Sequence, residues 1–242
     1  MVMAGRMAMS TGQARIPVAN TGRLMRTDAA LILSQWLSPS FPVGAFAYSH
    51  GLETAIQEGA VGSADTLECW LEDVLCAGTG RNDAILIAAA HGADPAPHGT
   101  VTVRQVDAVA RAFAASSERM SESLKMGRAF AATVAASHAV DLPELTYPVA
   151  VGRAARLLGL PLEMTQVLYL QSFLSNLVSV AVRLVPLGQT EGQRTLARLG
   201  RLCAPVAAAS RDRTLDDLAG TAFLSDIAAM RHESLRTRLF LS

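Results

Sequence analysis

The sequence predicts an all-α protein, built as a single-domain bundle of about ten helices. From Thr27 onward, apolar residues recur at spacings of three and four, and clusters of Gly and Pro separate these stretches. No alternation of apolar and polar residues, which would indicate a half-buried strand, extends beyond four residues. Half of the 242 residues are hydrophobic and 17% are charged, a composition that suffices for a sizeable core.

The N-terminal residues 1–26 differ in composition from the rest of the chain. They are rich in Met and Gly, and the first acidic residue of the sequence is Asp28. A secretory signal peptide needs a continuous apolar stretch of about 7–15 residues, which this segment lacks. We expect a flexible arm or a mis-assigned translation start here, followed by a helical domain at 27–235 and a partner-binding tail at 236–242.

Capping residues and breaks set the order of the expected helices. Thr27 and Asp28 are suited to cap the first helix, and Ser63 and Asp65 to open the third. The two prolines between residues 92 and 99 mark the clearest loop, and Pro205 predicts a kink. In chain order we expect helices at about 27–37, 45–58, 63–77, 82–90, 101–115, 117–138, 148–158, 161–185, 188–210 and 221–235.

The stretch 161–185 is expected to form a central, buried helix. Its apolar residues cover nearly the whole circumference, which is typical of a core helix. A membrane span needs about 20 mainly apolar residues, and polar side chains interrupt this stretch too often. These side chains form one narrow stripe that either bonds neighbouring helices or lines a polar passage or subunit interface: Ser172, Ser175, Asn176, Ser179 and Arg183.

The charge balance and the cysteines exclude several functional classes. The 21 basic and 21 acidic residues cancel, whereas nucleic-acid-binding domains usually carry a basic face. Cys69 and Cys76 lie seven residues apart, about 10 Å along a helix and beyond disulfide reach. With Cys203 they form no CxxC pair, so we expect neither a zinc site nor a redox site. A reducing cytosol, without nucleic acid or membrane as partners, fits this composition.

The sequence contains no catalytic motif, and we predict that the chain is not an enzyme. A GxxxxGKS phosphate loop, a GxSxG nucleophile elbow and an HExxH zinc motif are all missing. Residues 186–192 come closest, because glycines precede a helix N-terminus that could bind an anion. This segment lacks the lysine, and Glu191 would repel phosphate. We therefore interpret it as a tight turn between helices.

One charged helix face allows two interpretations. Glu118, Glu122, Lys125 and Arg128 lie three or four residues apart, so the face is either solvated or used to dock a partner. Gly127 in the same helix costs about 1 kcal/mol relative to Ala. We expect that this glycine permits the close approach of another helix backbone.

The C-terminal region carries two further features. Asp226 and Glu233 share a helix face beside His232, which we interpret as a satisfied or solvated cluster, since four metal ligands cannot come from this spacing alone. The tail 236–242 combines two arginines with a Leu-Phe-Leu triplet. It either packs back on the domain or docks to a partner.

Four segments of the chain resemble, in the same order, sequence blocks of the UreF family of urease accessory proteins. They read LSPSFPVGAFAYSHGLE at 37–53, ERMSESLKMGRAF at 118–130, VRLVPLGQTEGQ at 182–193 and DIAAMRHESLRTRLFLS at 226–242. The resemblance covers roughly residues 28–242, and four ordered blocks are more specific than any single one. Ala45 stands where the family usually has Gly, so this position does not strictly need a positive φ.

The resemblance implies an all-helical homodimer with no catalytic activity of its own. Such a protein joins the scaffold protein UreD, also called UreH, to the nickel-carrying GTPase UreG. The assembly delivers nickel to apo-urease in the cytoplasm. Nickel and GTP are then handled by partner proteins, and no cofactor is bound stably by this chain.

The resemblance also implies where partners bind. By motif position, Phe46 and Arg238 help to form the surface that recruits the GTPase, and the C-terminal segment becomes ordered on binding the scaffold protein. The expected partner-binding residues are Phe46, Tyr48, Arg231, His232, Glu233, Arg238, Leu239 and Phe240.

Two other functions are alternatives to the adaptor. A regulator of the partner GTPase, activating or with a checkpoint role, would insert an arginine that raises the hydrolysis rate about 10³–10⁵-fold. No feature of the sequence selects one arginine for this role. A transcriptional regulator would need a basic recognition helix near the N-terminus, which the first helix after Thr27 does not provide. Whether nickel passes through this chain stays open at the level of sequence.

Overall fold

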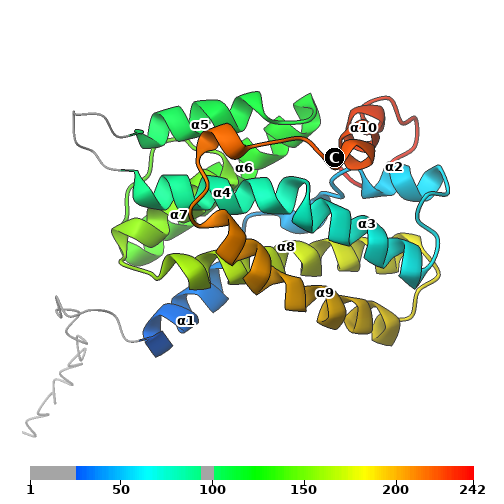
Figure 1. The fold of residues 1–242 in the computed structure, drawn as a ribbon, viewed down its shortest axis with the longest axis horizontal. Helices are drawn as coiled ribbons and strands as arrows, with labels where there is room; N and C mark the ends of the chain where they lie inside the picture. Colours follow the sequence, from blue (N-terminus) through cyan, green and yellow to red (C-terminus); the bar gives the residue numbers. More distant parts are fainter. Residues whose placement is uncertain (1–25, 94–100) are drawn as a thin grey trace, which may run out of the picture.

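The computed structural model describes residues 26–93 and 101–242, so the expected arm lies outside the described residues except for Arg26. The described chain is all-α, with no strand, as predicted. Its α-helices are α1 (Arg26–Trp36), α2 (Leu52–Gln57), α3 (Ala64–Cys76), α4 (Thr79–Gly92), α5 (Val103–Ala112), α6 (Ser117–His138), α7 (Tyr147–Leu157), α8 (Leu162–Leu184), α9 (Gln189–Ser210) and α10 (Phe223–His232), with short 3₁₀ helices η1 (Ala45–Ala47) and η2 (Leu215–Asp217) (Figure 1).

The core is built around α4 and α8, which run through the middle of the molecule (Figure 1). α4 packs against α3, α5, α7, α8 and α9, and α8 packs against α1, α2, α3, α4, α7, α9 and η1. The central helix expected at 161–185 is thus confirmed as α8. By length and composition α8 would also qualify as a membrane span, a test that core helices of soluble proteins pass as well.

Small residues let α7 lie directly on α4. A Cβ atom added to Gly152 of α7 would come within 2.5 Å of the carbonyl oxygen of Ile87 in α4. Ala150, Ala154 and Ala155 of α7 are fully buried. Because only small side chains lie between the two backbones, α4 and α7 pack closely against each other.

Of the caps expected from the sequence, Ser63 is confirmed. Ser63 accepts a hydrogen bond from the N–H of Thr66 in a capping box that opens α3, and Thr102 does the same with Gln105 at α5. The start of α4 differs from the prediction, because this helix begins at Thr79, before the expected Asn82. α1 begins at Arg26, which places the expected caps inside its first turn.

The helix expected at 45–58 is wrong as one element, because the chain breaks it into η1 and α2. His50 and Gly51 take positive φ values of 56° and 77°, which end helical geometry between the two pieces. A Cβ atom at Gly51 would lie 2.6 Å from the main-chain nitrogen of Ala229 in α10. The break therefore lets α10 approach, and it turns the main chain of residues 47–49 toward the end of the chain. Ala45 is not among the residues with positive φ.

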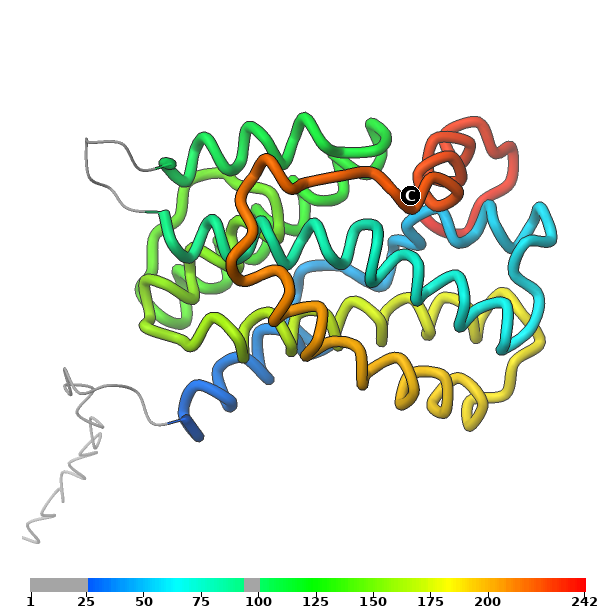
Figure 2. The backbone as a smooth tube through the Cα atoms, viewed as in Figure 1, coloured from blue at the N-terminus to red at the C-terminus, as the bar shows by residue number. Residues whose placement is uncertain are grey.

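The segment after α9, residues 211–242, returns across the bundle. After α9 it crosses α4 through η2, an element that the sequence analysis did not predict, and reaches α10 beside α2 (Figure 2). α10 packs against both α2 and α6. This path brings the C-terminal residues to the same end of the molecule as α2.

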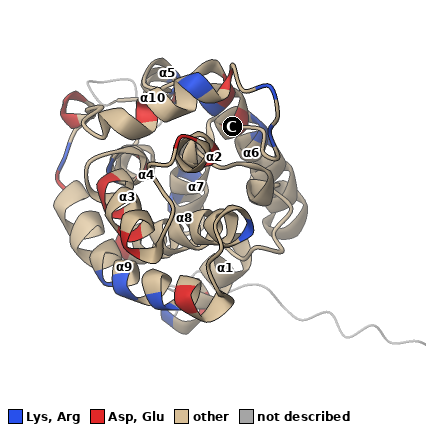
Figure 3. Cartoon of the chain, turned by 90° about the vertical axis from the view of Figure 1, so that its right-hand side faces the viewer, with Lys and Arg blue, Asp and Glu red and all other residues tan. Residues whose placement is uncertain are grey.

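Charged residues lie mainly on the outer turns, as the view onto the end with α2 and α10 shows for α3 and α9 (Figure 3). Nε of Arg198 in α9 donates to Glu68 of α3 at 2.6 Å and links these two helices. The three cysteines of the chain are free thiols, with Cys203 buried. The spacing argument against a disulfide between Cys69 and Cys76 is thereby confirmed.

Candidate partner-binding site

The C-terminal segment packs onto the chain between η1 and α2 through main-chain hydrogen bonds. The N–H of Leu241 donates to the carbonyl oxygen of Ala47 at 2.8 Å. The N–H of Ser49 donates to the carbonyl oxygen of Ser242, also at 2.8 Å, and the Ser49 hydroxyl donates to the same oxygen. Of the two alternatives for the tail, the structure thus shows that it packs back on the domain.

Glu53 is the main receptor for this segment. Its carboxylate accepts hydrogen bonds from the main-chain nitrogens of Leu239 at 2.7 Å and Phe240 at 3.0 Å. Glu53 is buried, and the ring of Phe240 is buried beside it. Because a buried carboxylate is costly unless hydrogen bonds satisfy it, the N–H groups of the docked tail compensate the burial of Glu53.

His232 lies fully buried between two carboxylates. Its Nε2 is 3.2 Å from Glu53 and its Nδ1 is 2.7 Å from Glu118, and Glu118 also pairs with the guanidinium of Arg238. His232 is therefore satisfied within a network, as interpreted from the sequence. Among the described residues, no group of three or more His, Cys, Asp or Glu is arranged to hold a metal ion.

A second buried network adjoins the first on α6. Glu122 pairs with Nε2 of His50 at 2.9 Å and with Arg119, and it accepts from the hydroxyl of Ser242. Burial alone would raise the pKa of Glu122, but the Arg119 guanidinium and His50 lower it to about 2. Burial lowers the pKa of His50, which favours the neutral imidazole.

These contacts correct the interpretation of the charged α6 face as one solvated or docking surface. Glu122 is buried, and Glu118 is largely enclosed by its partners. Only the second half of the face, with Lys125 and Arg128, is exposed, and Arg128 there pairs with Glu144. The spacing of three and four did not indicate this burial, because the tail and the turn after η1 cover the first half of α6.

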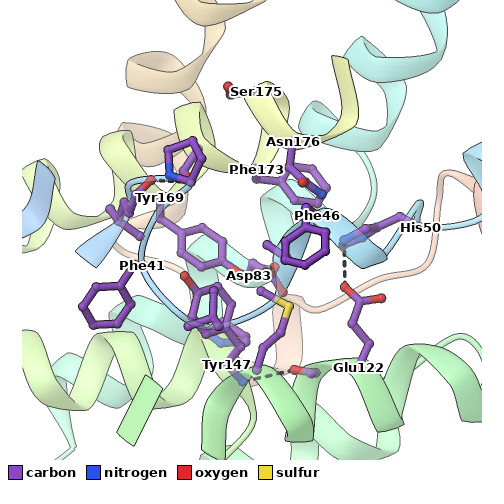
Figure 4. Close-up of a pocket in the computed structure, with 18 of the residues that line it drawn as sticks. Phe41, Phe46, His50, Asp83, Glu122, Tyr147, Tyr169, Phe173, Ser175 and Asn176 are labelled. Atoms are coloured by element: carbon purple, nitrogen blue, oxygen red, sulfur yellow. Dashed lines mark hydrogen bonds and ion pairs between the residues drawn. The ribbon is translucent and has the colours of Figure 1, made fainter. Parts of the chain in front are cut away.

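A cavity of about 150 Å³ lies beside the second network. Aromatic rings form much of its wall, and Figure 4 shows Phe46 and Phe173 near His50, with Phe41 and Tyr147 further along the cavity. All five residues of the predicted polar stripe of α8 line this cavity: Ser172, Ser175, Asn176, Ser179 and Arg183.

Asp83 of α4 is a partly buried acid in the wall of this cavity. It accepts a hydrogen bond from the hydroxyl of Tyr169 at 2.7 Å, and burial raises the pKa of Asp83 to about 6. With His50 and Arg119, Asp83 also lines a second cavity of about 90 Å³ on the side of α5 and α10. The two cavities therefore share a wall of ionisable side chains.

The inner residues of the polar stripe bond neighbouring segments, which is one of the two roles expected from the sequence. Ser172 donates to the carbonyl oxygen of Leu37 at 2.8 Å, and Asn176 donates to that of Tyr48 at 3.3 Å, so these two bond neighbouring segments. Ser179 bonds only within α8 and is exposed, as is Arg183. The inner half of the stripe is thus structural, and the outer half faces the mouth of the cavity.

The other predicted site residues divide into exposed and buried sets. Tyr48, His232 and Phe240 are buried, so they can act only by holding other groups in place. Glu233 caps α6, because its carboxylate accepts from the N–H and the hydroxyl of Ser117. The exposed members are Phe46, Arg231, Glu233, Arg238 and Leu239.

Sequence reasoning missed Glu53, Ser49 and Asp83 as site residues. Glu53 and Ser49 lie inside the first signature block, which was a usable signal, but their contacts are with residues more than 180 positions away. Asp83 had no signal beyond its place at the expected start of a helix.

Helix α10 carries an exposed apolar face next to the tail. Phe223, Leu224, Ile227 and Met230 are all exposed, at spacings that place them along one side of the helix. Exposed apolar patches of this kind mark surfaces for association.

Comparison with known proteins identifies the family of this chain. The UreF family model matches residues 61–200. A urease accessory protein UreF of Roseobacter denitrificans is 52% identical over 217 residues, 90% of this chain and 96% of that protein. UreF proteins of Cereibacter sphaeroides and Ruegeria pomeroyi are 52% and 49% identical, over 88% and 87% of this chain and 98% and 95% of their own lengths. The chain therefore belongs to the UreF family of urease accessory proteins.

Proposed function

We propose that this chain is a non-catalytic adaptor in urease maturation. It joins a scaffold protein of the UreD or UreH type to a UreG-type GTPase, so that nickel reaches apo-urease through the complex. The observation that carries this proposal is the docked tail, which presents Arg238 close to the first signature block. Family membership supports the role in urease maturation.

The proposed recruiting surface is composite. Phe46 and Arg238 are both exposed, and the bond between Leu241 and Ala47 joins the segments that carry them. Glu118 holds the Arg238 guanidinium on the surface of α6. A partner that contacts both side chains therefore binds fully only when the tail is docked.

The exposed apolar face of α10 supports the association of this chain into a homodimer. Phe223, Leu224, Ile227 and Met230 would lose their contact with water on dimerisation, at about 25 cal/mol for each Å² of apolar surface removed. A second copy of α10 offers a self-complementary surface of the same kind. Free, unpaired cysteines agree with a cytoplasmic location.

The test is co-expression with UreD-type and UreG-type partners, followed by size-exclusion chromatography with light scattering. We expect a defined complex that needs residues 232–242. Because His232 and Phe240 are buried, the Arg238→Ala variant accompanies this truncation and keeps the main-chain bonds of the tail to Glu53 and Ala47. A monomer that ignores both partners would overturn the proposal.

Regulation of GTP hydrolysis is the second candidate function. It is favoured by the exposed position of Arg238 on the C-terminal tail, where Glu118 holds its guanidinium. An inserted arginine raises hydrolysis by about 10³–10⁵-fold. Equal GTPase rates with and without this protein would exclude an activating role and leave only recruitment.

A further inference from the structure

Three acids are buried in the described chain, and each has partners that compensate its charge. Glu122 pairs with Arg119 on α6. Asp107 of α5 pairs with Arg111 at 2.7 Å. Glu53 accepts two main-chain N–H groups of the tail. Such partners are needed because an ionised carboxylate loses its hydration when it is buried.

Asp83 of α4 differs from these three acids. It is partly buried, and among the described residues it forms no ion pair and accepts one side-chain hydrogen bond, from the Tyr169 hydroxyl at 2.7 Å. Arg119 lines the same cavity of about 150 Å³, but its guanidinium is paired with Glu122. Once ionised, Asp83 therefore has a negative charge in the cavity wall that no side chain of the described ranges pairs with directly.

The wall around Asp83 is largely aromatic. Tyr169, which donates to Asp83, lies beside Tyr147 with the ring centroids 5.5 Å apart. Further rings come from other segments and line the same cavity (Figure 4): Phe41, Phe46 and Phe173. The face of an aromatic ring attracts an organic cation that lies within about 6 Å of the ring centre. A carboxylate among such rings recognises an alkylated ammonium ion, because the rings contact its alkyl groups and the carboxylate its charge.

Other classes of ligand fit this wall less well. Among residues 26–93 and 101–242, no group of three or more His, Cys, Asp or Glu is arranged to hold a metal ion. An anion would meet the Asp83 carboxylate, while Arg119 is already paired and Arg183 is exposed to water that screens its charge. The volume of about 150 Å³ admits only a small molecule.

We propose that this cavity binds a small alkylated ammonium ion, with its charge against Asp83 and its alkyl groups among the rings of Phe46, Tyr147 and Phe173. All of these groups belong to this chain. The inference therefore does not rest on the proposed adaptor function, and it is tested without any partner protein.

The first test compares three ligands of similar shape on the full chain by isothermal titration calorimetry. Choline carries the cation, the alcohol in which carbon replaces the choline nitrogen is neutral, and the anion of tert-butylacetic acid carries a negative charge. We expect choline to bind about tenfold or more tightly than the neutral alcohol. Equal affinities would show an apolar cavity without charge recognition. Tighter binding of the anion, or no binding of choline, would equally overturn the proposal.

The second test removes the charge of Asp83. Asp83→Asn keeps the shape of the side chain and an acceptor for Tyr169, and we expect choline to bind about tenfold more weakly. Asp73→Asn, which removes an exposed carboxylate from α3, should leave the affinity unchanged. Equal affinities for choline in Asp83→Asn and the unmodified chain would contradict the role of Asp83. The ligand comparison above needs no variant, so it decides the case even if Asp83→Asn does not fold.

The third test is the pH dependence of choline binding. Burial raises the pKa of Asp83 to about 6, and the cation binds the ionised form, so affinity should be about tenfold lower at pH 5 than at pH 7. The other ionisable groups around Asp83 come from several elements: Tyr169 of α8, Tyr147 of α7, Arg119 and Glu122 of α6, His50 before α2, and Asp226 of α10.

The Asp83→Asn variant separates Asp83 from these groups. Glu122, with a pKa of about 2, stays ionised from pH 5 to pH 7. Titration of His50 or Asp226 would persist in Asp83→Asn, whereas titration of Asp83 would not. We expect the affinity of Asp83→Asn for choline to be the same at pH 5 and pH 7. A pH dependence that this variant retains would assign the titration to another group and contradict the proposed contact with Asp83.

Discussion

The carbonyl oxygen of Leu145 lies against Gly127 of α6, in the space that a Cβ atom would occupy. Gly→Ala in a helix interior normally gains about 1 kcal/mol. Here the added methyl group meets backbone, which cannot swing aside as a flexible side chain would. We predict that Gly127→Ala lowers the free energy of unfolding by about 1–3 kcal/mol, as overpacking does, measured by chemical denaturation.

Gly92 is the matched control for this substitution. It ends α4, and an added Cβ atom would meet none of the described residues within 4 Å. Gly92→Ala should leave stability unchanged or raise it slightly. If both variants behave alike, the contact with Leu145 does not explain why residue 127 is a glycine. The sequence interpretation of Gly127 was right about a close backbone, although that backbone belongs to the segment just before α7.

Arg238→Ala should leave the fold intact and weaken recruitment of a UreG-type GTPase. The guanidinium is exposed and bonds only Glu118 in this network, while the tail keeps its main-chain bonds to Glu53 and Ala47. An exposed ion pair contributes about 0–1 kcal/mol to stability, so thermal unfolding should barely change. Co-elution of the full complex is the measurement.

Arg211→Ala controls for the loss of a surface arginine. It lies at the end of α9, is also exposed and pairs with Glu163 at 2.9 Å. The proposal requires that Arg238→Ala reduces co-elution more than Arg211→Ala does. Equal complexes from both variants and the unmodified chain would remove Arg238 from the recruiting surface.

Asp83→Asn should stabilise the protein at neutral pH and have little effect in acid. Burial raises the pKa of Asp83 from 3.8 to about 6, so the folded state binds this proton more tightly than the unfolded state does. The contribution of Asp83 to stability is therefore lost as the pH rises from about 4 through about 6. A neutral amide avoids this loss and still accepts from Tyr169, which predicts a gain of up to about 3 kcal/mol at pH 7.

Denaturation of both forms across this pH range measures the difference. Asp73→Asn removes a carboxylate from the exposed surface of α3 and is the control with which Asp83→Asn is compared. A stability difference for Asp83→Asn that does not grow with pH would show that the carboxyl is not held in its neutral form.

The helices could be predicted because their signals are local. Apolar spacing located α3, α6, α8 and α9 nearly to the residue, and Ser63 gave the start of α3. The break after η1 could not be predicted, because His50 is a non-glycine residue in a left-handed conformation. Tertiary contacts of His50 with Glu122 of α6 and Phe173 of α8 override its local preference. Nothing in the local sequence indicates these contacts.

The tail network could not be derived from spacing either. Glu53, Glu118 and His232 come from three helices, and each sequence neighbourhood taken alone is compatible with a solvated helix face. Charged residues at intervals of three and four give the same pattern whether water or another segment covers them. Only the path of the chain after α9 brings the last signature block onto the first two.

The outer half of the α8 stripe yields the last prediction, on urease activation. Ser175 and Ser179 line the cavity, and Ser179 bonds only to the carbonyl oxygen of Ser175. Replacing both by leucine fills the mouth of the cavity without removing a bond to another segment. If a polar passage runs here, the variant should assemble normally with its partners and fail to activate urease.

Ser137→Leu provides the control for added apolar bulk. Its hydroxyl also donates to the carbonyl oxygen four residues earlier, that of Thr133, and it is exposed on α6 away from the cavity lining. Urease activation and complex assembly should both be normal in this variant. Full activation by the Ser175→Leu, Ser179→Leu double variant would contradict a passage and leave the stripe with its structural role, since Ser172 and Asn176 would still bond Leu37 and Tyr48.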